Sequence, residues 1–360
     1  MIFDKMENDR EIWLANDDDD PGDPLLRQIL ENYLDARQVR APCETGQHWD
    51  VFRRDFDRVI RTPEIWPEFR RMGLSYGFDD SLKQGNERSN PSMKPAFKSH
   101  RGEGVRAWIF NDEALRRNIS ILVRKARSTL TPETIERMGE AQIGAPPAQV
   151  FRDFPKPIDF HDLSIVHFAQ RLEMIFADRP PRRVLEIGAG YGGLAAKLRH
   201  SWPTACFVLI DLPECGAIQH WYLTQAIPNA KIIGPGGSVP KGMFAGYFIL
   251  PPGAVINFQD GSFDLVINIR SLAEMSNAYV DYYIRSVTRL LDPLNGVFYC
   301  VNAESKSTSG ERIRLSEAAF GSDWHLESVA NVPWQPHIKE WVMRRFPAPQ
   351  QNWRTSLREA

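Results

Sequence analysis

The sequence predicts an α/β fold, an open and mainly parallel sheet with helices on both faces, preceded by a mainly helical N-terminal domain. From residue 183 onward, short apolar runs typical of buried strands alternate with longer segments of helical periodicity. Upstream of residue 158, aromatic and aliphatic residues recur at helical spacing instead. The chain has 360 residues, more than one ordinary domain requires, which favours a two-domain arrangement.

Proline-rich and acidic stretches divide the chain into four expected segments. An acidic run followed by Pro-Gly ends a flexible N terminus, and a cluster of prolines near residues 146–157 separates the two domains. Helices are expected from Pro24, around 49–60, around 115–122 and from Pro132, with a long polar loop over 83–104. The expected segments are residues 1–22, the helical domain 23–158, the sheet domain 159–346 and a tail 347–360.

Each expected strand is a short apolar run within the sheet domain. The last two runs are separated by a few residues that include two prolines, so they should pair as an antiparallel hairpin. The third strand is ambiguous, because 231–234 and 247–251 both qualify. The expected strands are 183–188, 206–211, 246–250, 264–269, 296–302, 324–331 and 338–345.

The segment 183–198 carries the most specific signal in the chain. It is a buried strand, a turn containing Gly188, Gly190 and Gly192, and then an amphipathic helix. Because glycine has no Cβ atom, the turn can be tight and a ligand can lie against its backbone. The ligand would then face the free N–H groups and the positive dipole end at the start of the helix. Glu186 stands at the carboxyl end of the strand, where open sheets bind ligands, and its carboxylate suits a cationic group such as an aminoacyl end.

The glycine spacing alone leaves three interpretations open. Gly188, Gly190 and Gly193 also satisfy G-x-G-x-x-G, the fingerprint of dinucleotide sites. Asp211 follows the second strand and could accept the ribose hydroxyls of adenosine in either class of site. A glycine turn that binds no ligand is the third interpretation.

Glu186 and the three glycines form E-x-G-x-G-x-G, which resembles motif I of class I S-adenosylmethionine-dependent methyltransferases. Four further segments look like the bacterial sugar O-methyltransferase family: 69–80, 191–194, 210–214 and 263–275. The resemblance implies a Rossmann-like sheet of seven strands with the last strand antiparallel, S-adenosylmethionine as cofactor, and methyl transfer to a sugar hydroxyl.

The resemblance assigns the cofactor acid to Glu186 and the ribose acid to Asp211. Asn268 and Ser271, at the end of the fourth strand, could line the cofactor or the acceptor. The expected cofactor-binding residues are Glu186, Gly188, Ala189, Gly190, Tyr191, Gly192, Asp211, Leu212, Asn268 and Ser271.

Methyl transfer is an in-line displacement, and a sugar hydroxyl needs a base or a metal to lose its proton. Glu274 is the first candidate for the base, Arg270 could orient an oxygen-rich acceptor, and His220 and His337 are alternative catalytic residues. Ser271-Leu-Ala-Glu274 also fits an S-x-x-E capping box, in which both side chains would cap the N terminus of a helix. The histidine that many O-methyltransferases carry in this loop is absent, which keeps a non-catalytic cofactor-binding scaffold open.

Composition and charge limit the classes of binding partner and the expected compartment. Hydrophobic residues at 42% and charged residues at 25% describe a soluble globular protein, and a net charge of −2 favours neither nucleic acid nor an anionic membrane as partner. There is no apolar run long enough for a membrane span, no signal core and no C-x-x-C pair, so a reducing cytoplasm is expected.

The acceptor and the oligomeric state stay open. The expected acceptor is a nucleotide-linked sugar or a glycan under assembly, with a phenol or amine of secondary metabolism as alternative and an NAD-dependent oxidoreductase as the rival class. No cluster of metal-ligand spacing is present, although magnesium stays an alternative because carboxylate sites leave weak signatures. A homo-oligomer is compatible with the sequence.

Overall fold

The structure is a computed structural model, which describes residues 23–43, 53, 56, 59–71, 124–125, 127–138, 142–146, 156–157, 160–236, 242–308, 311–315 and 320–345. The predicted N-terminal segment 1–22, the loop 83–104, the helix around 115–122 and the tail 347–360 lie outside the described residues.

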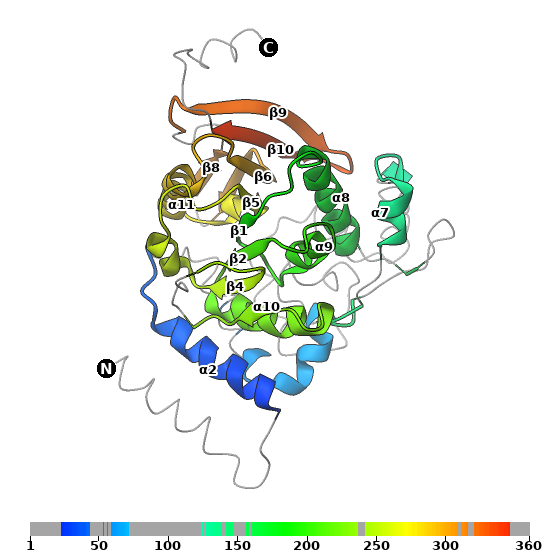
Figure 1. Cartoon of the computed structure of the whole chain (residues 1–360), viewed down its shortest axis with the longest axis vertical. Coiled ribbons are helices and arrows are strands. Elements are labelled where there is room, and N and C mark those ends of the chain that lie inside the picture. Colours follow the sequence, from blue (N-terminus) through cyan, green and yellow to red (C-terminus); the bar gives the residue numbers. More distant parts are fainter. Residues whose placement is uncertain are drawn as a thin grey trace.

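The central sheet has eight strands in the order β3-β4-β2-β1-β5-β6-β10-β9 (Figure 1). The predicted count of seven is wrong by one, because both candidates for the third strand are strands and pair with each other in parallel. The strands are β1 (Arg183–Ile187), β2 (Cys206–Ile210), β3 (Ile232–Ile233), β4 (Gly246–Leu250), β5 (Leu265–Ile269), β6 (Val297–Ala303), β9 (Trp324–Val332) and β10 (Gln335–Arg345).

Strand direction follows the predicted pattern of crossovers and one hairpin. Strands β3, β4, β2, β1, β5 and β6 pair in parallel, whereas β10 runs antiparallel to both β6 and β9. The chain first builds outward from β1 through β2 and β4, then returns to place β5 on the other side of β1. In open sheets this switch point, at the carboxyl ends of the strands, is where ligands bind.

Helices cover both faces of the sheet because the strand residues alternate between two apolar sets. Val184, Phe207 and Leu265 face one core, with residues of α8 (Phe160–Ile175), α9 (Gly193–Ser201) and α10 (Pro213–Ala226). Leu185, Val208 and Val266 face the other, with residues of η4 (Pro252–Asn257) and α11 (Asn277–Leu290). The alternation has the period of a strand, so the α/β layering follows directly from the sequence.

The described N-terminal residues share the first of these cores. Helix α2 (Pro24–Gln38) starts at the predicted cap, where the Asp23 side chain accepts the Leu25 amide, and it runs alongside α10 (Figure 1). Ile29 of α2, together with Trp66 and Phe69 of η1 (Pro63–Arg71), belongs to the same buried cluster as the sheet. The N-terminal part therefore packs as a layer over the helices of the sheet.

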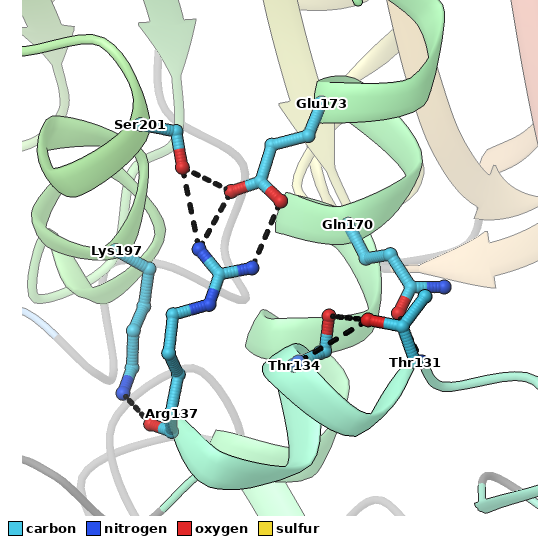
Figure 2. A network of polar contacts seen from close by, with 7 residues as sticks. All are labelled: Thr131, Thr134, Arg137, Gln170, Glu173, Lys197 and Ser201. Atoms are coloured by element: carbon cyan, nitrogen blue, oxygen red, sulfur yellow. Dashed lines mark hydrogen bonds and ion pairs between the residues drawn. The ribbon is translucent and has the colours of Figure 1, made fainter.

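A polar network fixes α7 (Pro132–Glu136) and the turn after it against α8 and α9 (Figure 2). Arg137 donates to both oxygens of Glu173, at 2.8 Å each, and Ser201 donates to the same carboxylate. Lys197 donates to the Arg137 carbonyl at 2.8 Å. Paired guanidinium and carboxylate groups of this kind give a defined orientation as well as attraction, so the network sets how this segment lies on the sheet domain.

Two further findings complete the fold. A small antiparallel pair that the sequence did not predict, β7 (Ser305–Thr308) and β8 (Glu311–Arg314), follows β6. Among the described residues, none of the helices is both long enough and apolar enough to cross a membrane.

Candidate ligand site at the carboxyl edge of the sheet

The glycine loop after β1 has the backbone that the sequence predicts. Gly188, Gly190 and Gly192 have φ values of +72°, +61° and +86°, in the left-handed region that glycine adopts without strain. A Cβ atom on Gly188 would collide with the Ser271 side chain. The Gly188 amide donates to the Ile210 carbonyl at 2.8 Å, which joins the loop to the end of β2.

Glu186 lies in the strand just before this loop, with a side chain that is 4% exposed. Its Oε2 atom makes no hydrogen bond to any described residue. Burial, with a smaller contribution from the Asp211 charge, raises the pKa of Glu186 to about 8. A buried carboxyl oxygen without a partner costs free energy, about 1–3 kcal/mol for a neutral group, so this position suits a ligand that donates a hydrogen bond and carries positive charge.

Asp211 holds the glycine loop from the end of β2. Its Oδ2 accepts the Gly190 amide at 2.9 Å, and its Oδ1 accepts the Leu212 amide at 2.8 Å. Burial raises the pKa of Asp211 to about 6 despite these hydrogen bonds, which act in the opposite direction. A carboxylate has about four acceptor positions, and the Gln219 amide at 3.4 Å and the Cys215 thiol also donate to Asp211, so a ligand hydroxyl would have to replace one of these weaker contacts.

Gln219 of α10 is a site residue that sequence reasoning missed. It is fully buried, and its amide nitrogen donates to the Gly190 carbonyl at 2.9 Å and to Asp211 at 3.4 Å. The sequence offered only a weak signal, because the same helix also carries Glu214, His220, Thr224 and Gln225. Together, Asp211 and Gln219 bind both the N–H and the carbonyl of Gly190, so the loop is held in place by protein groups alone.

The other predicted loop residues serve the backbone or the packing. Ala189 is buried and its carbonyl accepts the Gly192 amide, while Leu212 precedes α10. The Tyr191 ring lies between η1 and α10: its centroid is 5.5 Å from that of the Phe69 ring and 4.6 Å from that of the Tyr222 ring. Tyr191 thus links the glycine loop to η1.

Asn268 and Ser271 lie together under the loop. The Asn268 amide nitrogen donates to the Ile187 carbonyl at 2.9 Å and to Ser271 Oγ, and its oxygen accepts from Asn302 at 2.9 Å. The Ser271 hydroxyl donates to the Ile187 carbonyl at 3.2 Å and makes no cap hydrogen bond to η5 (Leu272–Glu274). The predicted capping box is therefore not formed by Ser271, because its hydroxyl supports β1 instead.

The loop after β5 contains a strained residue. Arg270 has φ +63°, uncommon for a residue with a Cβ, and its guanidinium donates to the Gln335 side chain at the start of β10. Glu274 follows at the end of η5 and is partly exposed. The antiparallel course of β10 brings its first residues to the carboxyl end of β6, because Ile338 pairs with Ala303. Arg270 and Gln335 therefore lie at the ligand edge.

The structure places the two predicted histidines far apart in the sheet order. His220 is buried on α10 beside Gly234, which follows β3 at one end of the sheet, and burial lowers its pKa to about 4. His337 is exposed on β10, near the other end.

A different histidine lies near the β9–β10 turn. His167 of α8 packs edge-on against Trp334, with ring centroids 4.7 Å apart, and both side chains are buried. Neither His167 Nδ1 nor Trp334 Nε1 makes a hydrogen bond to a described residue. Burial lowers the pKa of His167 to about 4, so the ring is neutral at pH 7. The sequence showed no sign of this pair, since its members are far apart in the chain.

Within the described part of the chain, no group of three or more His, Cys, Asp or Glu residues could hold a metal ion. The free cysteines Cys206, Cys215 and Cys300 are buried, as expected for small apolar residues.

No protein-family model matches the sequence, and no curated protein matches it. Among solved structures, a protein of Pyrococcus horikoshii is similar at 16% identity and TM-score 0.37, over 52% of this chain and 92% of that one. A SAM-dependent methyltransferase of Aquifex aeolicus is similar at 12% identity and TM-score 0.34, over 49% and 89%. A Burkholderia thailandensis 1,6-didemethyltoxoflavin-N1-methyltransferase with bound S-adenosylhomocysteine is similar at 15% identity and TM-score 0.33, over 50% and 76%. With TM-scores this low, the likenesses do not specify an activity for this chain.

Proposed function

We propose that the chain is an S-adenosylmethionine-dependent methyltransferase that methylates a sugar hydroxyl. The cofactor assignment rests on Glu186, a buried carboxyl group beside a preformed glycine loop, because its Oε2 atom has no hydrogen-bond partner among the described residues. The α-ammonium of an aminoacyl group would supply both the hydrogen bond and the charge that this oxygen lacks. A dinucleotide would instead bring a pyrophosphate to the loop, and its negative charge would oppose ionisation of Glu186.

The rest of the site fits the same cofactor. The N terminus of α9, which begins at Gly193, offers free amides and the positive end of a helix dipole to a carboxylate. Asp211 would accept a ribose hydroxyl in place of its long contact with Gln219. S-adenosylmethionine would supply an electrophilic methyl group on its sulfonium sulfur.

The chain must hold the acceptor hydroxyl in line with that methyl group and remove its proton. The C–O bond forms as the C–S bond breaks, and the products are a methyl ether and S-adenosylhomocysteine. We assign Glu274, which is partly exposed in the loop after β5, as the general base that accepts this proton. Arg270, fixed by Gln335, would orient the acceptor.

The acceptor class rests on the four short segments that resemble the sugar branch, and on the polar groups near the β9–β10 turn. Trp334 offers an indole N–H and neutral His167 offers a nitrogen, a donor and an acceptor that suit hydroxyl groups. An amine or phenol of secondary metabolism is the alternative, because the fold alone does not fix an acceptor.

The test is transfer of a labelled methyl group from S-adenosylmethionine to nucleotide sugars and methyl glycosides, with catechol and tyramine as competing classes. We expect the labelled methyl group to appear on a sugar, as an ether that is stable to base. Glu274→Gln should lower turnover while cofactor affinity is kept, and Glu327→Gln on the exposed strand β9 is the matched control. Label only in catechol or tyramine would refute the sugar acceptor, and cofactor binding without any transfer would favour a scaffold.

A further inference from the structure

A cation from the N-terminal layer lies against the glycine loop. Arg70 in η1 is 2% exposed, and its guanidinium carbon lies 5.0 Å from the centre of the Tyr191 ring. Tyr191 stands between Gly190 and Gly192, so Arg70 packs on a side chain that the glycine loop supplies. Arginine is rarely buried to this extent without a structural or binding reason.

The neighbouring backbone is built to hold Arg70 in this place. The Arg70 amide donates to the Gly144 carbonyl at 3.0 Å, and Gly144 has φ +81°. A Cβ atom on Gly144 would lie 2.8 Å from Arg70 Cγ and would collide with the Phe69 ring. Phe69 in turn packs edge-on against both Tyr191 and Tyr222. The pair Phe69-Arg70 is thus seated between Gly144 and the glycine loop.

The loop therefore has a buried group of each sign close to it. Glu186 precedes the loop within β1, and Arg70 covers Tyr191 in the middle of the loop. A ligand end that carries both charges on one carbon atom is complementary to such an arrangement. A guanidinium presents N–H donors in a planar fork that matches a carboxylate.

We propose that Arg70 binds the carboxylate at the aminoacyl end of the cofactor, while Glu186 binds the ammonium on the same carbon. This inference rests on the proposed cofactor and adds a residue of the N-terminal layer to its site. Arg70 would add a full positive charge to the helix dipole that the N terminus of α9 offers to the same carboxylate.

The test compares two ligands by calorimetric titration, S-adenosylhomocysteine and its decarboxylated analogue, which keeps the ammonium and lacks the carboxylate. We expect the wild-type protein to prefer S-adenosylhomocysteine by about tenfold or more, the range of one charge-assisted contact. Arg70→Met should abolish that preference by weakening only the first ligand, and Arg70→Lys should keep part of it. Arg137→Met, which removes the cation after α7 that is paired with Glu173, should keep the preference.

Three outcomes would overturn the inference. They are equal wild-type affinity for the two ligands, a preference that survives in both Arg70 variants, and an equal loss of both ligands in those variants, which would mark Arg70 as a packing residue. Wild-type protein that binds neither ligand would instead refute the proposed cofactor. The wild-type comparison stands even if Arg70→Met does not fold.

Discussion

The amide of Gly190 donates a 2.9 Å hydrogen bond to Oδ2 of Asp211, so the acid after the second strand holds the loop after the first. Gln219 binds the Gly190 carbonyl from α10. The loop is therefore shaped before any ligand arrives, and a preformed site loses less conformational entropy on binding.

Asp211→Ala should weaken S-adenosylhomocysteine binding about tenfold to hundredfold, because it removes both a loop contact and a ribose acceptor. Titration calorimetry measures the effect. Asp264→Asn is the matched control, because Asp264 accepts the Arg182 and Arg183 amides at the amino end of β1, away from the ligand edge. Unchanged affinity in Asp211→Ala would remove Asp211 from the site.

Glu186 should make binding depend on pH. With a pKa of about 8 in the free protein, its carboxyl is largely protonated at pH 7. A bound ammonium favours the ionised form, so binding releases a proton and affinity rises as the pH approaches 8. Titrations in buffers of different ionisation enthalpy measure the release, which Glu186→Gln should abolish. Proton uptake, or the same release in the variant, would contradict the assignment.

Gly188→Ala should destabilise the fold by about 1–3 kcal/mol, since alanine is strained at positive φ and would meet Ser271. Adding Ser271→Gly should recover part of the loss, because it removes the collision and leaves the backbone strain. Urea unfolding measures both. Gly242→Ala, with nothing within 4 Å of the added atom, is the control. A neutral single variant would mean that the loop is not fixed as described.

Arg137→Met should lower the free energy of unfolding by about 1–2 kcal/mol at pH 7, because Glu173 loses its bidentate partner (Figure 2). Burial raises the pKa of Glu173, but the hydrogen bonds from Arg137 and Ser201 outweigh it and hold that pKa below its usual 4.5. The pair's contribution is present above that value and is lost as the pH falls below it. Urea unfolding at pH 7 and pH 4 checks this, and an equal difference at both would contradict it.

Most strands were predictable from the sequence because each is a short apolar run. Successive side chains along a strand point to opposite faces of the sheet, which assigns them to the two cores. Glu186 was predictable because it stands near the end of the first apolar run, just before the glycine turn, and Asp211 because it directly follows the second run. The roles of Asn268 and Ser271 were not, since they depend on contacts with Ile187 and Asn302 from other strands. The same holds for the histidines: neither His220 burial nor the packing of His167 on Trp334 follows from local spacing.

The strand count was missed for a local reason. Ile232–Ile233 is only two residues long, which is too short to show the alternating pattern that predicts a strand, so its pairing with β4 was not predictable. The position of Arg70 over Tyr191 likewise joins segments far apart in the chain, and only the folded structure shows it.

Calorimetric titration of the purified protein with S-adenosylhomocysteine and, separately, with NAD tests the cofactor assignment directly. We expect micromolar affinity for S-adenosylhomocysteine, none for NAD, and a loss of about tenfold or more in Glu186→Gln. Binding of NAD alone, or equal affinity for S-adenosylhomocysteine in Glu186→Gln, would contradict it.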